Sequence, residues 1–101
     1  MALKTKPFDA ARYFDSPEAQ ARLLNDALAS GDAGYIANAL GVVARARGMS
    51  QLARDTGLSR AALYAALSEE GNPTLDTVLK VVKALGIKLQ AREAMPSADA
   101  A

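Results

Sequence analysis

The sequence predicts an all-α protein, and three of its features lead to that prediction. Segments with apolar residues at helical spacing begin after Ser, Asp or Thr and end before Gly, which are the usual N-cap and C-terminal residues of helices. Half of the 101 residues are hydrophobic, so the chain is able to bury a core. Only five residues are aromatic, and alanine therefore fills much of that core between closely packed helices. The length indicates a single domain.

The first helix is expected over residues 17–30. Ser16 fits the N-cap, Pro17 fits the first helical position, and Gly31 fits the position after the last turn. One face carries apolar residues at helical spacing, namely Leu24, Ala27 and Leu28.

The second helix is expected over residues 33–47, between an Asp32 N-cap and Gly48. An apolar face consists of Ile36, Leu40 and Val43, and an adjacent face of small residues consists of Ala37, Gly41 and Ala44. Small residues let a neighbouring helix approach closely, so we expect tight packing along this side. Arg45 and Arg47 lie in the last turn, where they suit the helix dipole, with phosphate contact as a secondary interpretation.

Two short helices are expected next. Ser50 is the predicted N-cap of a helix over residues 51–56, and Gly57 ends that helix. A fourth helix starts at Ser59 and runs to about residue 68, where a loop with turn-forming residues follows.

The fifth helix is expected over residues 75–85, between a Thr74 N-cap and Gly86. Its predicted core stripe consists of Leu75, Val78, Leu79, Val82 and Leu85. Lys80 and Lys83 face outward.

After the fifth helix the apolar period changes. Ile87, Leu89 and Ala91 alternate with polar residues, which predicts a short C-terminal strand. Such a strand needs a partner, either the N-terminal arm or its copy in a dimer, and the sequence leaves both open. We expect three regions, an arm over residues 1–15, a helical domain over residues 16–92 and a disordered tail over residues 93–101.

The chain contains no cysteine and no histidine. It therefore has no disulfide, no thiolate nucleophile and neither of the residues that most often bind zinc. No other polar residues form a recognisable catalytic frame, so we expect a non-enzyme that uses no metal and no cofactor. No apolar run approaches the roughly 18 residues of a membrane helix, and the N-terminus lacks a secretory signal. We therefore expect no membrane partner and a cytoplasmic location.

The net charge is only +1, but its distribution is uneven. Residues 9–32 hold five carboxylates against two arginines, and residues 33–60 hold four arginines against one carboxylate. An acidic segment therefore precedes a basic one, which is compatible with a nucleic-acid contact in the middle of the chain.

Residues 50–68 have the spacing of a helix–turn–helix. Gly57 permits a sharp left-handed turn between the two short helices. The expected inner faces consist of Leu52, Ala53, Leu58, Leu63, Ala66 and Leu67. Motifs of this kind place their second helix in the major groove of DNA.

The stretch "SQLARDTGLSRAALYAALSEEGNPTLDTVLKVVKALGI" resembles the Cro and lambda-repressor (XRE-like) helix–turn–helix family. The resemblance covers Met49 to Ile87, and the residues in register are Leu52, Ala53, Gly57, Ser59, Leu63 and Pro73. It implies a five-helix, lambda-repressor-like DNA-binding domain.

The resemblance also implies a DNA-reading face on the second helix of the motif. Ser59 would cap that helix and touch a phosphate or a base edge. Arg60 would bridge O6 and N7 of guanine, and Ala61 would meet a thymine methyl group. Tyr64, one turn further, would contact a phosphate or a base edge. The alternatives are a solvated Arg60 and a Tyr64 that packs or makes a dimer contact.

Gln51 matches a family position that clamps a backbone phosphate, and Arg54 would reinforce the contact from the i+3 position. The alternative for Gln51 is an ordinary polar residue of a first helical turn. The loop after the second helix is often basic in this family, but here it carries Glu69 and Glu70. DNA binding by one subunit should then be weak, so we expect a homodimer that reads two half-sites about 34 Å apart.

The N-terminal half narrows the resemblance. "FDAARYFDSPE", "GDAGYIANALGVVARARGMS" and "LSRAALYAALSEEGNPTLDT" are similar to bacterial HigA-type antitoxins, described as probable addiction-module antidotes, and the similarity runs from Pro7 to Leu89. It implies a paired RelE/ParE-superfamily (HigB-like) toxin, neutralised by direct binding, and repression of the shared operon through operator DNA.

The acidic segment is suited to a basic toxin. The aromatic residues at its start, Phe8, Tyr13 and Phe14, either pin the arm by packing or anchor the partner. Two other functions remain open. One is a protein-interaction module whose helix–turn–helix is only a scaffold, and the other is a phage-type repressor without a toxin.

Overall fold

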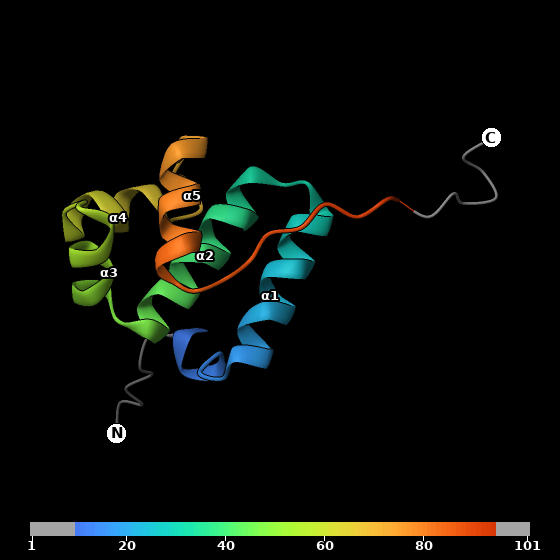
Figure 1. The fold of residues 1–101 in the computed structure, drawn as a ribbon, viewed down its shortest axis with the longest axis horizontal. Helices are drawn as coiled ribbons and strands as arrows, with labels where there is room; N and C mark the ends of the chain where they lie inside the picture. The colour runs from blue at the N-terminus through green and yellow to red at the C-terminus, as the bar shows by residue number, and fades with distance from the viewer. Residues whose placement is uncertain (1–9, 95–101) are drawn as a thin grey trace, which may run out of the picture.

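Five α-helices make up the fold of residues 10–94, the part of the chain that the computed structural model describes (Figure 1). They are α1 (Pro17–Ser30), α2 (Ala33–Arg47), α3 (Met49–Thr56), α4 (Arg60–Ala66) and α5 (Leu75–Ala84), and a short 3-10 helix, η1 (Ala10–Tyr13), precedes them. No strand occurs within residues 10–94. The prediction of an all-α, five-helix fold is therefore confirmed.

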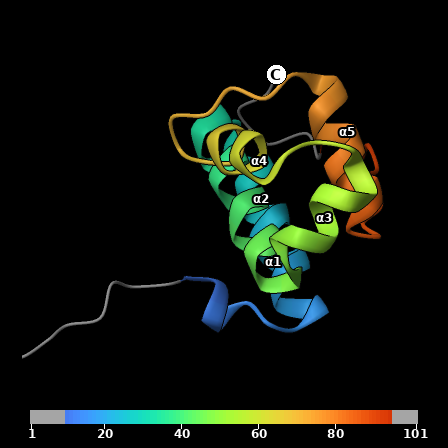
Figure 2. The ribbon, with the colours of Figure 1, turned by 90° about the vertical axis from the view of Figure 1, so that its left-hand side faces the viewer.

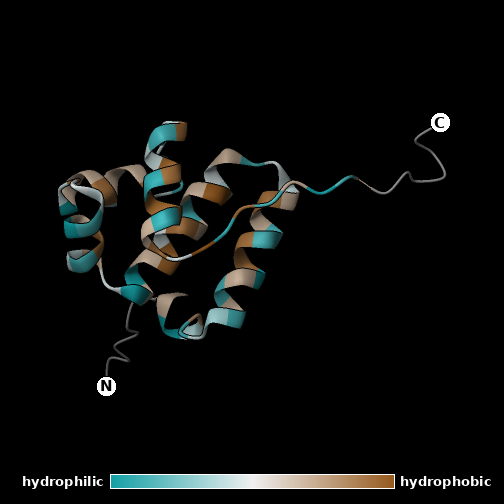
Figure 3. Cartoon of the chain, viewed as in Figure 1, coloured by the Kyte–Doolittle hydropathy of each residue, from teal (hydrophilic) through white to brown (hydrophobic). Residues whose placement is uncertain are grey.

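Helix α2 is the central helix. It contacts η1, α1, α3 and α4, and its residues 39–44 are all buried. Helices α1 and α2 lie side by side, α3 and α4 lie at the opposite end of the molecule, and α5 packs against α3 (Figure 1). Hydrophilic residues alternate with hydrophobic stripes along the helices, as expected for helices that each bury one side (Figure 3).

Side-chain caps start four of the five helices as the sequence predicts. The hydroxyl oxygens of Ser16, Ser59 and Thr74 each accept a bond from the backbone N–H three residues on, at 3.0 to 3.1 Å. Asp32 accepts from the first-turn N–H groups of α2. These oxygens satisfy N–H groups that have no partner within their own helix.

The prediction that Ser50 caps the third helix is wrong. Helix α3 begins at Met49, and its N-cap is Gly48, which makes no side-chain bond. The N–H of Gly48 donates to the carbonyl of Ala44 and closes α2, while its own carbonyl accepts from Leu52 and opens α3. Burial of Met49 in the core sets this early start, because the residue has to lie on the helix to reach the other apolar side chains.

The small-residue side of α2 makes the close approach that the sequence predicts. A Cβ placed on Gly41 would lie 2.1 Å from the backbone oxygen of Leu67, at the end of α4. No side chain fits at that distance, so glycine is required where these two segments meet.

The predicted core stripe of α5 is partly wrong. Val81, Val82 and Leu85 are buried, but Leu75 is 71 % exposed and Leu79 is 50 % exposed. Helix α5 packs with α3 on one flank, so its buried face is centred on Val81 and not on the predicted stripe. In α1 likewise, Leu24 and Ala27 are buried while Leu28 is 43 % exposed.

Residues 87–94 run as an extended segment from the end of α5 toward α1, without the expected strand (Figure 1). Ile87 packs against the core, and Leu89 lines an apolar hollow beside α1 and α2. The predicted strand is therefore absent from the described residues, and so is the predicted alternation of burial, because Ile87 is half-buried but Leu89 and Ala91 are exposed.

The buried side-chain amide of Gln20 and the neighbouring Arg47 bond to the backbone just before α1 and at the end of α5. Gln20 is 2 % exposed, and its Nε2 donates to the carbonyl of Phe14 at 2.8 Å. Its Oε1 accepts from Nε of Arg47, whose Nη1 donates to the carbonyl of Leu85, both at 2.8 Å. Arg47 thus bonds to the end of α5 as well as lying in the last turn of its own helix.

The segment before α1 packs on the helical body, because Ala11 of η1 is buried and η1 contacts α2. The division into arm, domain and tail stays a prediction. Residues 1–9 of the expected arm and residues 95–101 of the expected tail lie outside the described residues.

Candidate nucleic-acid interface

Helices α3 and α4 form a compact pair at one end of the molecule, where both are exposed to solvent on the side that Figure 2 shows. Only residues 57–59 separate them. Gly57 has a φ of 76°, and its N–H donates to the carbonyl of Ala53 at 2.9 Å. The predicted left-handed glycine turn is present.

Thr56 fixes the exit from this turn. Its hydroxyl donates to the carbonyl of Leu52 at 2.8 Å and accepts from the N–H of Leu58 at 3.2 Å. The turn therefore has bonds on both sides, and the angle between α3 and α4 is set before any ligand binds.

The inner faces of the two helices pack as predicted. Leu52, Leu63 and Leu67 are buried with exposed fractions of 3 % or less. Ala53 and Leu58 are half-buried and pack against the same core. One face of α4 is thus committed to the core, and its opposite face is left for other contacts.

The outward face of α4 carries the residues that the resemblance selects. Ser59, Arg60, Ala61 and Tyr64 are all exposed, and Tyr64 is 45 % exposed. Arg60 and Tyr64 are one turn apart, so their side chains share one flank of the helix. Alanine leaves the helix backbone accessible, and two further exposed alanines of α4, Ala62 and Ala65, are not among the candidate residues.

Ser59 is engaged as the cap of α4, and its hydroxyl oxygen accepts from the N–H of Ala62 at 3.0 Å. A hydroxyl that accepts one bond still has its own proton to donate. Ser59 is thus able to cap the helix and donate to a phosphate oxygen together.

The structure brings Gln51 and Arg54 together on α3. Nη2 of Arg54 donates to Oε1 of Gln51 at 2.8 Å, and Nε2 of Gln51 donates to Oδ1 of Asp55, also at 2.8 Å. Sequence reasoning missed Asp55, although its position four residues after Gln51 was a usable signal. All three side chains are exposed, and Gln51 lies in the first turn of α3.

The acidic loop after α4 is fixed against α2. A Cβ on Gly34 would lie 2.8 Å from the backbone oxygen of Glu69, and a Cβ on Gly71 would lie 2.1 Å from that of Ala66. Glycine at both positions lets the loop fold back over the end of α4 and onto the first turn of α2. The side chains of Glu69 and Glu70 stay exposed.

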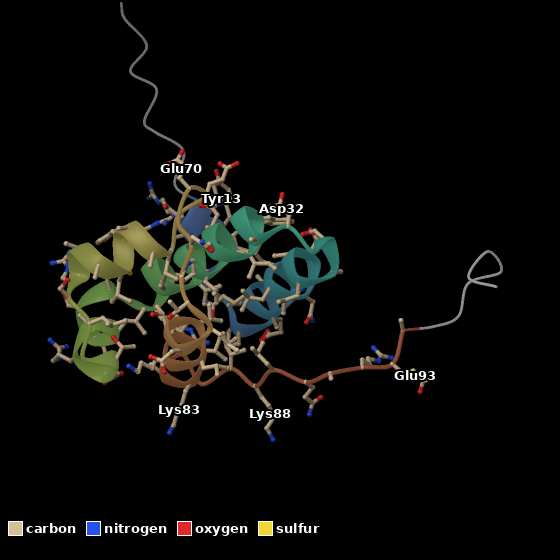
Figure 4. The ribbon with its side chains drawn as sticks, turned by 90° about the horizontal axis from the view of Figure 1, so that it is seen from above. Tyr13, Asp32, Glu70, Lys83, Lys88 and Glu93 are labelled. Carbon is tan, nitrogen blue, oxygen red and sulfur yellow. The ribbon has the colours of Figure 1, made fainter. Side chains whose placement is uncertain are left out.

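Two labelled carboxylates and two labelled lysines lie on opposite sides of the molecule, and Glu93 lies on the side of the lysines (Figure 4). Figure 4 shows Glu70 and Asp32 on one side, together with Tyr13, and Lys83 and Lys88 on the other. The loop that carries Glu70 therefore lies on the side of Asp32, which we call the acidic side, and away from Lys83 and Lys88.

A second polar contact ties α1 to α2 near the acidic side. The hydroxyl of Tyr35 donates a short hydrogen bond to Oδ2 of Asp26. This bond, with a contribution from desolvation and from the charge of Asp26, raises the pKa of Tyr35 above its ordinary value of 10.0.

Residues 10–94 hold neither a cluster of possible metal ligands nor a helix of membrane-spanning character. They contain no group of three or more carboxylate side chains placed to hold a metal ion. None of their helices has the length and apolar character needed to cross a membrane.

Comparison with known proteins gives one family and one relative. A family model described as "Probable addiction module antidote protein" matches residues 4–93. An uncharacterized protein of Haemophilus influenzae (strain ATCC 51907 / DSM 11121 / KW20 / Rd) is 47 % identical over 93 residues, which cover 92 % of this chain and 96 % of the relative. No solved structure matches the chain.

Proposed function

The chain belongs to the family of probable addiction module antidote proteins, and from this membership we propose that it is the antitoxin of a type II toxin–antitoxin module. The match over residues 4–93 carries the proposal, because it includes every helix of the fold. In this role the protein binds its cognate toxin directly and blocks it, and no catalytic step by the antitoxin is needed.

The proposed toxin is a small basic protein of the RelE/ParE superfamily, similar to HigB, and the chain is then a HigA-type antitoxin. The acidic side of the molecule supports a basic partner. Asp32 and Glu70 lie on that side with Tyr13, which is 69 % exposed. Complementary charge speeds the encounter of two proteins and disfavours wrong partners.

A second activity in the proposal is repression of the module's own operon through DNA binding by α3 and α4. Arg60 reads guanine in the major groove, Ala61 and Tyr64 contact bases or phosphates beside it, and Ser59 donates to a phosphate. Gln51 and Arg54 hold a phosphate at the start of α3. The exposed outward face of α4 and the bonded Gln51–Arg54 pair support these roles.

The proposed repressor is a homodimer. One copy offers a seven-residue α4 for base contacts, and the loop beside it is acidic. A two-fold dimer doubles the contacts by reading two half-sites about 34 Å apart.

The toxin proposal is tested with the gene adjacent to the one that encodes this chain. We expect that gene to encode a small basic protein whose expression arrests growth, and we expect co-expression of this chain to restore growth. The two purified proteins should form a complex in isothermal titration. Growth arrest that this chain does not relieve would refute the antitoxin role.

The DNA proposal is tested by gel shifts with the promoter region at about 150 mM salt. Arg60→Ala should lose about 1 to 3 kcal/mol of binding free energy and relax the preference for its guanine, whereas Gln51→Ala should weaken binding to all sequences. Arg22→Ala, an exposed arginine of α1, is the matched control. If Arg60→Ala and Gln51→Ala both bind as tightly as the wild type, the proposed reading face is wrong.

Two observations favour the alternative in which the helix pair is only a scaffold for protein contacts. The net charge is +1, and the loop beside α4 carries two glutamates. A steep fall of DNA affinity with rising salt would count against this alternative, because only phosphate neutralisation gives that dependence. The second alternative, a phage-type repressor, predicts DNA binding but no toxin gene nearby.

A further inference from the structure

The core of residues 10–94 contains one buried polar side chain, the amide of Gln20 in α1, which is 2 % exposed. Its Nε2 donates to the carbonyl of Phe14 and its Oε1 accepts from Nε of Arg47, each at 2.8 Å. An apolar side chain of similar size would fill the same space without the cost of removing an amide from water. The two hydrogen bonds are therefore what an amide contributes at this site.

The bond to Gln20 fixes an arginine that lies on the surface. Arg47, the last residue of α2, is exposed, and its Nη1 donates to the carbonyl of Leu85 at 2.8 Å. A free arginine side chain samples many rotamers, and holding it in one of them costs entropy. Two bonds at different nitrogen atoms hold the plane of this guanidinium in one orientation. Arg47 is thus a surface cation whose orientation is set from the core.

The guanidinium of Arg47 has donors left for a ligand. A guanidinium carries five N–H groups, and Gln20 and Leu85 use one each. Nη2 bonds to no atom of residues 10–94, so both of its N–H groups are available. The fixed fork of an arginine matches the oxygens of a phosphate, which makes a phosphate the ligand that suits these donors.

Arg47 lies beside the proposed phosphate contact at Gln51. Both residues line one hollow together with Gly48, at the joint of α2 and α3. Arg47 belongs to the last turn of α2, and Gln51 to the first turn of α3. Two side chains with free donors therefore come to the same place from two helices.

One carboxylate also lines this hollow. Asp55 accepts from Nε2 of Gln51 through its Oδ1. It lies one turn further along α3, whereas Arg47 precedes the first turn, which contains no acidic residue. Repulsion by Asp55 therefore directs an anion toward the Arg47 side of Gln51.

We propose that Arg47 is a further phosphate contact in the DNA interface and that Gln20 is its positioning residue, an inference that rests on the proposed DNA binding by α3 and α4. Nη2 of Arg47 and the second amide hydrogen of Gln51 donate to one backbone phosphate, and Gln20 holds the guanidinium ready for it. A phosphate contact carries no base information, so it strengthens binding to every duplex equally. Helix α1, which lies outside the helix pair, takes part in DNA binding through one buried amide.

The contact is tested by fluorescence anisotropy with the full-length protein, a promoter duplex and an unrelated duplex over a range of salt concentrations. Arg47→Gln removes the charge and keeps an amide donor. We expect its affinity to fall about three- to tenfold on both duplexes, and the slope of log affinity against log salt to become about 0.9 shallower. Arg22→Gln, at an exposed arginine of α1, is the matched control and should change neither quantity appreciably.

Arg47→Lys separates the charge from the fork. It should keep the salt slope of the wild type and lose about two- to threefold in affinity, because an ammonium is a point charge without the fixed fork. It also tests the contact if Arg47→Gln does not fold. Affinity and slope equal to those of the wild type in either folded Arg47 variant would overturn the proposal.

The positioning role is tested by a double-mutant cycle. Gln20→Leu removes both amide bonds and leaves the charge of Arg47 in place. We expect about a two- to threefold loss of affinity with an unchanged salt slope, and no further loss when Gln20→Leu is added to Arg47→Gln. Urea unfolding measures how much of each variant is folded under the binding conditions.

A purely structural role of Gln20 predicts a different cycle, in which Gln20→Leu lowers the affinity by the same factor in both backgrounds. That result, or a Gln20→Leu variant that binds like the wild type, would overturn the positioning role. A wild type that binds no duplex would refute the proposed DNA binding and the Arg47 contact with it. A wild type that binds, and loses affinity with Gln51→Ala but not with Arg47→Gln, would refute the Arg47 contact alone.

Discussion

At the scale of single residues, hydrogen bonds determine how ready the candidate interface is for a phosphate. Gln51 uses one donor and its acceptor within α3, in bonds to Asp55 and Arg54. Its amide has a second donor hydrogen, and the two neighbours fix the direction in which the amide points. Asp55 therefore orients Gln51, but it also places a negative charge next to the proposed phosphate contact.

This dual role gives a prediction for Asp55→Asn. The asparagine keeps an acceptor oxygen for Gln51 and removes the charge, so DNA affinity should rise about two- to threefold, as expected for one charge at about 8 Å in water. The gain should be the same for operator and unrelated duplexes and should shrink with salt. Fluorescence anisotropy measures both, with Asp15→Asn as the control. Weaker binding by Asp55→Asn would contradict the proposed phosphate site.

The sequence predicted which residues are exposed in the candidate site better than it predicted their neighbours. All six candidate residues, Gln51, Arg54, Ser59, Arg60, Ala61 and Tyr64, are exposed, because helical periodicity with Leu52 and Leu63 on the inside fixes the outer face. The bond between Gln51 and Asp55 depends on rotamers, which no residue pattern specifies. Their roles toward DNA stay predictions until the gel shifts are done.

At the scale of elements, a side-chain bond near the Gly31 turn links α1 and α2. Tyr35 of α2 donates to Asp26 of α1, and the bond requires a protonated phenol. The folded state raises the pKa of Tyr35. The contribution of the Tyr35–Asp26 bond to stability is therefore complete below about pH 10 and is lost as pH rises through the raised pKa.

We therefore expect the difference in free energy of unfolding between wild type and Tyr35→Phe to be constant below about pH 10 and to shrink above it. Urea unfolding from about pH 8 to about pH 11 measures this difference. The chain has three tyrosines and no tryptophan, so ultraviolet titration also follows tyrosinate formation directly. Tyr35→Phe should remove the step at highest pH. A stability difference that does not change with pH would show that the bond contributes nothing.

Helix ends were predictable where capping chemistry is local, and unpredictable where packing decides. Ser16, Asp32 and Thr74 cap their helices through atoms within three residues. Ser50 does not cap α3, because Met49 is drawn into the core by distant residues. The alternation after α5 likewise predicted a strand, but only Ile87 of its three apolar residues packs against the core. A β-ladder also needs a second strand, and that is a property of the whole fold.

At the scale of the whole molecule, α2 connects the proposed functions. The acidic loop rests on its first turn at Gly34, and the end of α4 rests on its middle at Gly41. Residues of α2 also line an apolar hollow together with residues of α1 and α5. The acidic loop and the end of α4 thus both rest on one buried helix. The helical period predicted that α2 has an apolar and a small-residue side, but the burial of Leu75 and Leu79 was wrongly predicted, because periodicity does not tell which edge of a helix meets a neighbour.

The joint between α2 and α3 consists of Gly48 alone, which has a φ of 113° and uses both its N–H and its carbonyl in the flanking helices. A one-residue joint whose backbone groups are both bonded cannot absorb an insertion or a deletion. One inserted residue would turn the following helix by about 100° relative to the core, since an α-helix has 3.6 residues per turn. Members of this family that gain or lose residues should therefore do so near the chain ends and not at this joint. The number of residues between α2 and α3 should therefore be constant in the family, because it sets how the exposed helix pair is oriented on the buried helix.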